Sequence, residues 1–242
     1  MIDLHSHILP EIDDGAHSLR DSLEMARMAV DSGVTAMVAT PHCVEDRRWE
    51  IYDAWKMLCE MLEECEIPLK LVMGMEIFGT EDTASMLRDG KLLPLNDSGY
   101  PLIEFSFRSD GEVETQILRS VIRAGFRPVV AHPERYTYVQ RDPELINRWF
   151  RMGCLFQVNR GSLMGRFGGH AQMIGMELVE RRFAAVIASD AHSSYIRTPW
   201  MLDVHQLLSK EFSHGYADLL LEHNPESILK NEELHLAEPE WF

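Results

Sequence analysis

Residues 1–16, MIDLHSHILPEIDDGA, join a short strand-like run to a cluster of polar side chains. Residues 2–5 have the character of a β-strand, and because side chains alternate along a strand, His5 and His7 are predicted to face the same side. Asp13 and Asp14 follow just before a glycine, as in many turns. Taken alone, the stretch has two interpretations: an exposed strand end followed by a turn, or the first corner of a metal site.

Outward from this stretch, short apolar runs alternate with amphipathic segments along the chain. Residues 18–31 carry apolar side chains at helical spacing behind a Ser18–Asp21 capping pair, and Asn224 before Pro225 predicts the N-cap of a last helix. The strand-like runs lie at 2–5, 34–40, 69–78, 101–107, 127–132, 154–159 and 184–190. This alternation predicts a parallel βα array, which periodicity alone does not resolve into an open doubly wound sheet or a closed barrel.

Most of the strand-like runs end in, or lead directly into, a side chain that could bind a metal. A lone histidine at a strand end is more often an ordinary hydrogen-bonding residue than a ligand. However, the carboxyl ends of the strands meet at one face of a barrel, and Glu76 and Glu104 stand among apolar neighbours where an unpaired carboxylate is costly to bury. The runs together therefore favour a metal site, with candidate side chains His5, His7, His42, Glu76, Glu104, His132, Asp190 and His192.

The composition limits the class and the compartment of the protein. With 242 residues, 45% of them hydrophobic and 26% charged, the chain is expected to form a single domain. No apolar stretch approaches the roughly 20 residues of a membrane span, and no leader is expected before the first strand. Four scattered cysteines without a C-x-x-C pair suit a reducing compartment. We therefore expect a cytoplasmic protein without membrane insertion.

The charge balance bears on possible partners. Acidic residues outnumber basic ones 39 to 23, which gives a formal net charge of −16. Binding to nucleic acid is not expected, because neutralising its phosphates needs clustered Lys and Arg. Any phosphate chemistry must instead rest on local cations.

Eight motifs, in this order and with this spacing, resemble the polymerase and histidinol phosphatase (PHP) superfamily: HSHILPEIDDG, VATPHC, GMEIF, LIEFSF, AHPERY, QVNRGSLMGRFG, ASDAHSSYIRTP and NPESIL. They resemble most closely the bacterial manganese-dependent protein-tyrosine phosphatases of capsule and exopolysaccharide operons. The resemblance covers residues 1–230 and leaves 231–242 as an acidic C-terminal tail. It implies an α/β fold, a distorted (β/α)7 barrel in a single domain. It also implies a cluster of up to three ions, usually manganese and sometimes iron or zinc.

The resemblance also implies roles for individual residues. Asp14 is favoured over Asp13 as a ligand because the family pattern places the ligand beside the glycine, and Glu76 is expected to bridge two ions. Arg135 in HPERY and Arg197 in SSYIRTP match the positions where the family holds phosphate, and a guanidinium fork suits phosphate oxygens. The implied metal ligands are His5, His7, Asp14, His42, Glu76, Glu104, His132, Asp190 and His192. This mixed imidazole and carboxylate set suits borderline to hard divalent metals.

The function implied by the resemblance is hydrolysis of a phosphomonoester, with a metal-bridged hydroxide attacking phosphotyrosine while Arg135 and Arg197 neutralise the phosphoryl oxygens. The implied partner is a phosphotyrosine protein, namely a cognate bacterial tyrosine kinase. Two alternatives stay open. A histidinol-phosphate or other small-molecule PHP phosphoesterase would use the same ligands. A non-catalytic metal-binding regulatory module would be expected to lack some ligands, and none of the nine is missing.

A rival mechanism rests on Cys154 and Arg160, which have the C-x5-R spacing of cysteine-dependent tyrosine phosphatases. The intervening residues LFQVN are apolar and strand-like. They contain none of the glycines that let backbone N–H groups turn toward an anion. We therefore expect Cys154 to be a small buried residue at the start of a strand.

Overall fold

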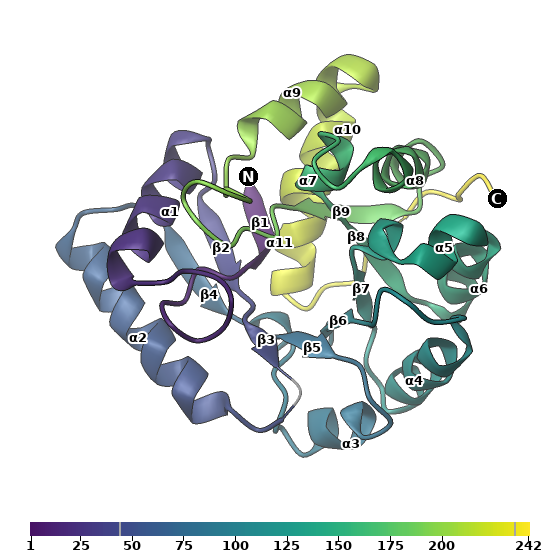
Figure 1. Ribbon diagram of the computed structural model, residues 1–242, viewed down its shortest axis with the longest axis horizontal. Helices are drawn as coiled ribbons and strands as arrows, with labels where there is room; N and C mark the ends of the chain where they lie inside the picture. The colour runs from purple at the N-terminus through teal and green to yellow at the C-terminus, as the bar shows by residue number, and fades with distance from the viewer. Residues whose placement is uncertain (44, 235) are drawn as a thin grey trace.

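The computed structural model describes residues 1–43, 45–234 and 236–242. In this part of the chain the paired strands all run parallel and form one sheet of three strands and one of six (Figure 1). The smaller sheet has the order β1 (Ile2–Ser6), β2 (Ala36–Ala39), β4 (Lys70–Met73). The larger sheet has the order β3 (His42–Cys43), β5 (Glu76–Phe78), β6 (Leu102–Glu104), β7 (Val129–Ala131), β8 (Leu155–Asn159), β9 (Ala184–Ala188).

The two sheets continue one another, because β3 follows β2, and β5 follows β4, after two residues each. Between these strand segments the Gly74 N–H donates to the carbonyl oxygen of Ala39 at 2.9 Å, which keeps the strands paired. Beyond β9, Ala191 forms a parallel bridge with Ser6 at the end of β1. The pairing thus returns to β1, as the expected distorted barrel requires. The predicted single α/β unit of parallel strands is confirmed.

Helices surround the strands (Figure 1). The Ser18 cap is confirmed, because its Oγ accepts from the Asp21 N–H at 3.2 Å. The Asn224 cap is wrong: the last helix continues directly from a π-helical turn, and the Asn224 side chain donates to the Ala185 carbonyl oxygen at 2.7 Å.

The helical segments are α1 (Leu19–Asp31), α2 (Arg48–Glu64), α3 (Thr83–Arg88), η1 (Leu95–Asp97), α4 (Glu112–Arg123), η2 (Pro133–Arg135), α5 (Thr137–Arg141), α6 (Glu144–Met152), α7 (Arg160–Leu163), α8 (Gly169–Glu180), α9 (Leu202–Glu211), α10 (His214–Asp218), η3 (Leu219–His223) and α11 (Asn224–Leu229). Among the described residues, no helix is both long and apolar enough to cross a membrane.

The core lies in two buried apolar clusters. The larger joins the helices to the outer side of the strands and includes Trp149, Phe156 and Phe183. The smaller cluster contains side chains from β1, β2, β4 and β6 to β9. It therefore fills the space that the paired strands enclose. Its strand residues include Leu4, Val38, Val72, Leu102, Ala131, Leu155 and Val186. We call these strand residues of the smaller cluster the apolar floor. Because side chains alternate, the residues two positions further along several of these strands face the same enclosed space, next to the apolar floor.

The segment 231–242, expected as an acidic tail beyond a domain at 1–230, packs back onto the protein where it is described. Leu234 is buried with the smaller apolar cluster. Phe242 stacks on Phe183 with ring centroids 5.4 Å apart, and the Glu240 N–H donates to the Arg181 carbonyl oxygen at 2.9 Å. The boundary at residue 230 stays a prediction.

Asp3 ties β1 to the end of β9 from inside the protein. Its carboxylate is fully buried and accepts hydrogen bonds from the N–H of Ser189 at 2.9 Å and from the Ser189 Oγ at 2.5 Å. Burial raises the pKa of the Asp3 carboxyl, although the hydrogen bonds from Ser189 act in the opposite direction. Closure of the strand ring on this side therefore depends on a buried polar contact.

Asp3→Ala is expected to lower the free energy of unfolding by about 2–4 kcal/mol, because it leaves the Ser189 N–H unpaired inside the protein and the Ser189 Oγ with only the longer contact to the His5 carbonyl oxygen at 3.3 Å. Urea denaturation measures this change. The control is Asp31→Ala, at the exposed end of α1, which is expected to stay within about 0.5 kcal/mol of the wild type. A loss for Asp3→Ala no larger than that of the control would contradict the role of Asp3.

Candidate metal centre

Histidine, aspartate and glutamate side chains gather where the strands end. In the described part of the chain they form four overlapping groups, in each of which the potential ligand atoms lie within 4.8 Å of one another. The groups are His7, Asp14, His42, His192; His5, His7, Asp190; His5, Glu76, His132; and His42, Glu76, Glu104. Together the groups contain the nine residues expected as metal ligands. The structure therefore brings all nine together, although they are spread from residue 5 to residue 192.

Glu76 lies at the centre of these groups. Its Oε2 is 3.1 Å from His5 Nε2 and 3.2 Å from His7 Nε2, and its Oε1 is 2.8 Å from His132 Nε2. The side chain is buried, which opposes ionisation. Even so, the charge of His5 and the hydrogen bonds from His132 and other histidines hold the pKa of the Glu76 carboxyl well below its usual range. Glu76 is therefore a buried carboxylate shared by several imidazoles.

Several buried polar atoms of the groups lack a hydrogen bond among the described residues, namely Glu76 Oε2, Asp190 Oδ1, His42 Nδ1 and His132 Nδ1. Three of these atoms have a charged neighbour without the geometry of a hydrogen bond. Glu76 Oε2 and Asp190 Oδ1 lie near imidazole nitrogens, and Arg197 also contacts Asp190 Oδ1. His42 Nδ1 lies 2.7 Å from Glu104 Oε1. Buried polar atoms are normally hydrogen-bonded, so such atoms call for another partner. Clustered lone pairs of imidazole and carboxylate fit a divalent cation.

Asp13 and Asp14 have different surroundings. Asp13 is half-buried with its side chain 6% exposed, and it accepts from His7 Nδ1 at 2.7 Å, from the His42 N–H at 2.9 Å and from the Gly15 N–H at 2.9 Å. Its lone pairs are thus largely occupied, and it orients the His7 ring. Asp14 is largely exposed, with Oδ1 3.4 Å from His42 Nε2 and 3.5 Å from the Nε2 of His192.

The glycine after these aspartates has a steric reason. A Cβ at Gly15 would lie 2.2 Å from the carbonyl oxygen of His7, a distance that no side chain can adopt. The turn can therefore fold back over His7 only with glycine at this position. Asp13 and Asp14 thus make different contacts, and the assignment of Asp14 to the metal stays a prediction.

Gln157 and Asn159, on β8, belong to the site although the sequence analysis gave them no role. Both are fully buried. Gln157 Oε1 lies 2.9 Å from His5 Nδ1, and its Nε2 donates to Asn159 Oδ1 at 2.8 Å. The Asn159 Nδ2 in turn donates to Asp190 Oδ2 at 2.5 Å. Because an amide oxygen can only accept, the contact of Gln157 Oε1 favours a His5 proton on Nδ1 and leaves the lone pair of Nε2 facing the other ligands.

Arg135 and Arg197 converge on the same carboxylate. Arg135 Nη1 donates to Asp190 Oδ2 at 3.1 Å, and Arg197 contacts Asp190 Oδ1. Both guanidinium side chains keep about a fifth of their surface exposed, so they reach solvent at the rim of the centre. Arg197 and Asp190 both have positive φ angles, of 52° and 50°, which are uncommon for residues with a side chain. The two arginines are thus placed where an anion could meet them.

The pair Cys154 and Arg160 is not arranged as a phosphate-binding loop. Cys154 is buried, and burial raises the pKa of its thiol to about 12. Arg160 is engaged elsewhere, because its Nε and Nη2 donate to the two carboxylate oxygens of Asp203 at 2.7 and 2.6 Å. A neutral, buried thiol and a paired guanidinium supply neither the nucleophile nor the anion site of a cysteine-dependent phosphatase.

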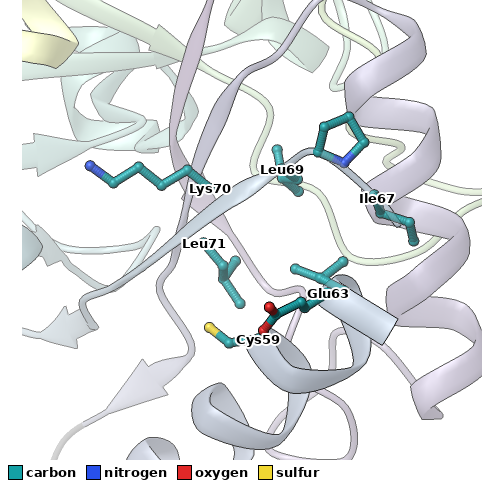
Figure 2. A pocket seen from close by; sticks show the side chains of 8 residues that line it. Cys59, Glu63, Ile67, Leu69, Lys70 and Leu71 are labelled. Atoms are coloured by element: carbon teal, nitrogen blue, oxygen red, sulfur yellow. The ribbon is translucent and has the colours of Figure 1, made fainter. Parts of the chain in front are cut away.

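Two cavities differ in their relation to the nine residues. One of 320 Å³ opens beside His42 and Glu104 and is also lined by Cys43, Arg47 and Phe78. Another of 330 Å³ lies between the end of α2 and the start of β4 (Figure 2). Its lining includes Cys59, Glu63, Ile67, Leu69, Lys70 and Leu71, and none of the nine. The cavity beside His42 therefore leads to the candidate ligands, and a further cavity of 190 Å³ opens at the rim beside Arg135 and Phe167.

Comparison with known families gives a match over residues 1–230, to the family described as capsular polysaccharide synthesis, CpsB/CapC. The chain belongs to the CpsB/CapC family. This family is the one to which the capsule and exopolysaccharide resemblance pointed, so that prediction is confirmed. The match takes in all nine candidate ligands and both arginines.

Relatives in the CpsB/CapC family align along nearly their full length. The tyrosine-protein phosphatase YwqE of Bacillus subtilis is 35% identical over 244 residues, which cover 99% of this chain and 96% of the relative. The putative tyrosine-protein phosphatase CapC of Staphylococcus aureus is 32% identical, over 98% of this chain and 91% of the relative. A crystal structure from work on YwqE of Bacillus subtilis and CpsB of Streptococcus pneumoniae, described there as unique metal-dependent tyrosine phosphatases, has a TM-score of 0.94. It is 34% identical and covers 100% of this chain and 99% of that chain.

Proposed function

We propose that this member of the CpsB/CapC family is a metal-dependent protein-tyrosine phosphatase, an enzyme that hydrolyses a phosphomonoester. The observation that carries the proposal is the convergence of five histidines and four carboxylates around Glu76, with two arginines at the rim. The full-length similarity to relatives named as tyrosine phosphatases supports the substrate class.

The nine residues would hold up to three divalent ions, with manganese as the expected metal and iron or zinc as substitutes. His5, His7 and Asp190 form one set of ligands, and Asp14, His42 and His192 form another. His132 groups with His5 and Glu76, and Glu104 groups with His42 and Glu76, so Glu76 is the carboxylate that these two groups share. When bound, such ions act as Lewis acids toward phosphoryl oxygens and lower the pKa of water in the site.

The charge of the site explains why the ions are needed. Asp14, Glu76, Glu104 and Asp190 together repel a phosphate dianion unless the cations that they hold outweigh their charge. Arg135 and Arg197 add two fixed positive charges, and a guanidinium fork can donate to two phosphate oxygens at once. An acidic protein can therefore bind phosphate locally.

The substrate that we propose is phosphotyrosine in a protein, with a bacterial tyrosine kinase of the capsule system as the partner. The phenol that leaves has a pKa of about 10, lower than that of an alkyl alcohol, so the chain need not supply a dedicated general acid. Arg135 and Arg197 bind and orient the phosphoryl group, and Asp13 and Gln157 keep the histidine rings in place. A cytoplasmic location, expected from the scattered cysteines, stays part of the proposal.

Removal of metal is expected to abolish hydrolysis of an aryl phosphate, and manganese is expected to restore it. The measurement is the release of p-nitrophenol from p-nitrophenyl phosphate, before and after chelation and after manganese is added back. The matched control is Cys154→Ser, which removes the thiol of the rival mechanism and is expected to leave the activity unchanged. Full activity of a chelated protein that elemental analysis shows to be free of metal would falsify the proposal.

The substrate class is tested by comparing kcat/KM for a phosphotyrosine peptide, a phosphoserine peptide and histidinol phosphate with the manganese-loaded enzyme. We expect the phosphotyrosine peptide to be preferred by at least about tenfold, a difference of roughly 1.4 kcal/mol in transition-state binding. A preference for histidinol phosphate would instead make the protein a small-molecule phosphoesterase with the same metal ligands.

Gln157→Leu is expected to weaken manganese binding by about 10- to 100-fold, because His5 loses the acceptor that fixes its tautomer. Titration calorimetry of the metal-free protein measures the Kd. The control is Asn224→Ala, which removes another buried amide, one that bonds only to the Ala185 carbonyl oxygen in the described structure. This control is expected to lower stability but to keep the Kd within about threefold. An unchanged Kd for Gln157→Leu would contradict the positioning role.

A further inference from the structure

Phe167 lies against both arginines of the candidate site. The guanidinium carbon of Arg135 is 4.3 Å from the centroid of the Phe167 ring, and that of Arg197 is 5.6 Å from it. Phe107 contacts Arg135 as well, with 4.8 Å between guanidinium carbon and ring centroid. All three separations fall within the range of about 6 Å in which a ring attracts a cation. One aromatic ring thus contacts two charges that carry the same sign.

The position of Phe167 is not explained by the core. Among the described residues, Phe167 belongs to neither buried apolar cluster. It is half-buried, while the residues before and after it, at 164–166 and 168–170, are exposed. Packing in the core therefore does not set the position of the Phe167 ring, and its neighbours include the two guanidinium groups.

The Phe167 ring packs directly against the backbone of Gly161, in α7. A Cβ at Gly161 would lie 2.5 Å from the Cε2 of Phe167, which is closer than atoms can approach without a shift. The backbone of Gly161 is not in the left-handed region, and the three atoms nearest to an added Cβ all belong to Phe167, so this contact is what opposes alanine there. The glycine therefore leaves room for the ring beneath the arginines.

Stacking suits an arginine that must bind an anion. A ring contacts the flat face of a guanidinium, while the N–H donors lie in the plane and point outward from its edge. The ring also places electron density beside two guanidinium groups that would otherwise repel each other as they converge on Asp190. The contact thus holds the two arginines together and leaves their donors available.

We propose that Phe167 is a positioning residue that holds Arg135 and Arg197 as one clamp for the phosphoryl group. This inference rests on the proposed function, because it concerns how the phosphate is bound. Phe167 itself does not touch the reacting atoms. It acts through the two arginines, so its loss weakens binding of phosphate before it affects the chemical step.

The test uses the full-length, manganese-loaded enzyme and three variants, Phe167→Ala, Phe167→Leu and Phe167→Tyr. The measurements are kcat and KM for p-nitrophenyl phosphate and the inhibition constant of inorganic phosphate. For the Ala and Leu variants we expect KM and the inhibition constant to rise about tenfold, with kcat changed less than about threefold. The Tyr variant keeps the ring and is expected to stay close to the wild type.

The control for loss of an aromatic ring is Phe212→Ala, because Phe212 is also half-buried but packs on Tyr216 away from the site. Phe212→Ala is expected to leave KM and the inhibition constant of phosphate unchanged. An inhibition constant for Phe167→Ala equal to that of the wild type would overturn the proposal. So would full recovery in Phe167→Leu, because side-chain volume rather than the aromatic face would then be sufficient.

Gly161→Ala gives an independent readout, since it displaces the ring without removing it. We expect it to weaken phosphate inhibition as Phe167→Ala does, and to have no further effect in the Phe167→Ala background. Additive effects of the two changes would contradict the shared mechanism.

Arg135→Ala separates this inference from the proposed function. If Arg135→Ala weakens phosphate inhibition and Phe167→Ala does not, the positioning role is wrong while the phosphate site stands. If neither variant changes the inhibition constant, the assignment of Arg135 to phosphate binding fails, and the clamp fails with it.

Discussion

The structure depends on a carboxylate, that of Glu76, held in the interior within about 3 Å of imidazoles from three separate segments, which contribute His5 and His7, His42, and His132. An unpaired buried carboxylate costs several kcal/mol, and Asp190 adds a second one nearby. Without cations, protons on the histidines balance these charges: burial lowers the pKa of His5, but Glu76 and Asp190 raise it above its usual value overall. Divalent ions would release such protons and replace them with more charge.

The fold places these charges through the alternation of side chains along its strands. On β6, Leu102 belongs to the apolar floor and Glu104 to the site. On β8, Leu155 belongs to the floor, while Gln157 and Asn159 orient His5 and Asp190 above it. The same strand therefore contributes to stability with one residue and to the site with the next on that face. Parallel strands make this work because their carboxyl ends meet at one side.

Much of this arrangement could be predicted from the sequence, because the candidate ligands lie at strand ends and so follow a local pattern that repeats along the chain. The amide pair Gln157 and Asn159 was missed, since an amide at a buried strand position has no role until its partners in other strands are known. The alternating Q-x-N in an apolar strand was the available signal. The contact of Phe167 with Arg135 and Arg197 joins residues about 30 positions apart and has no periodicity to reveal it. The cap at Asn224 failed because a π-helical turn precedes it without a break.

The central claim is that Glu76 is shared by ions bound to the surrounding histidines and carboxylates. Anomalous diffraction from a crystal of the manganese-loaded protein, recorded on both sides of the manganese absorption edge, tests it most directly. The account predicts up to three manganese peaks within bonding distance of the nine residues, with Glu76 contacting at least two of them. A single peak that Glu76 does not contact, or manganese bound only outside the nine residues, would contradict it.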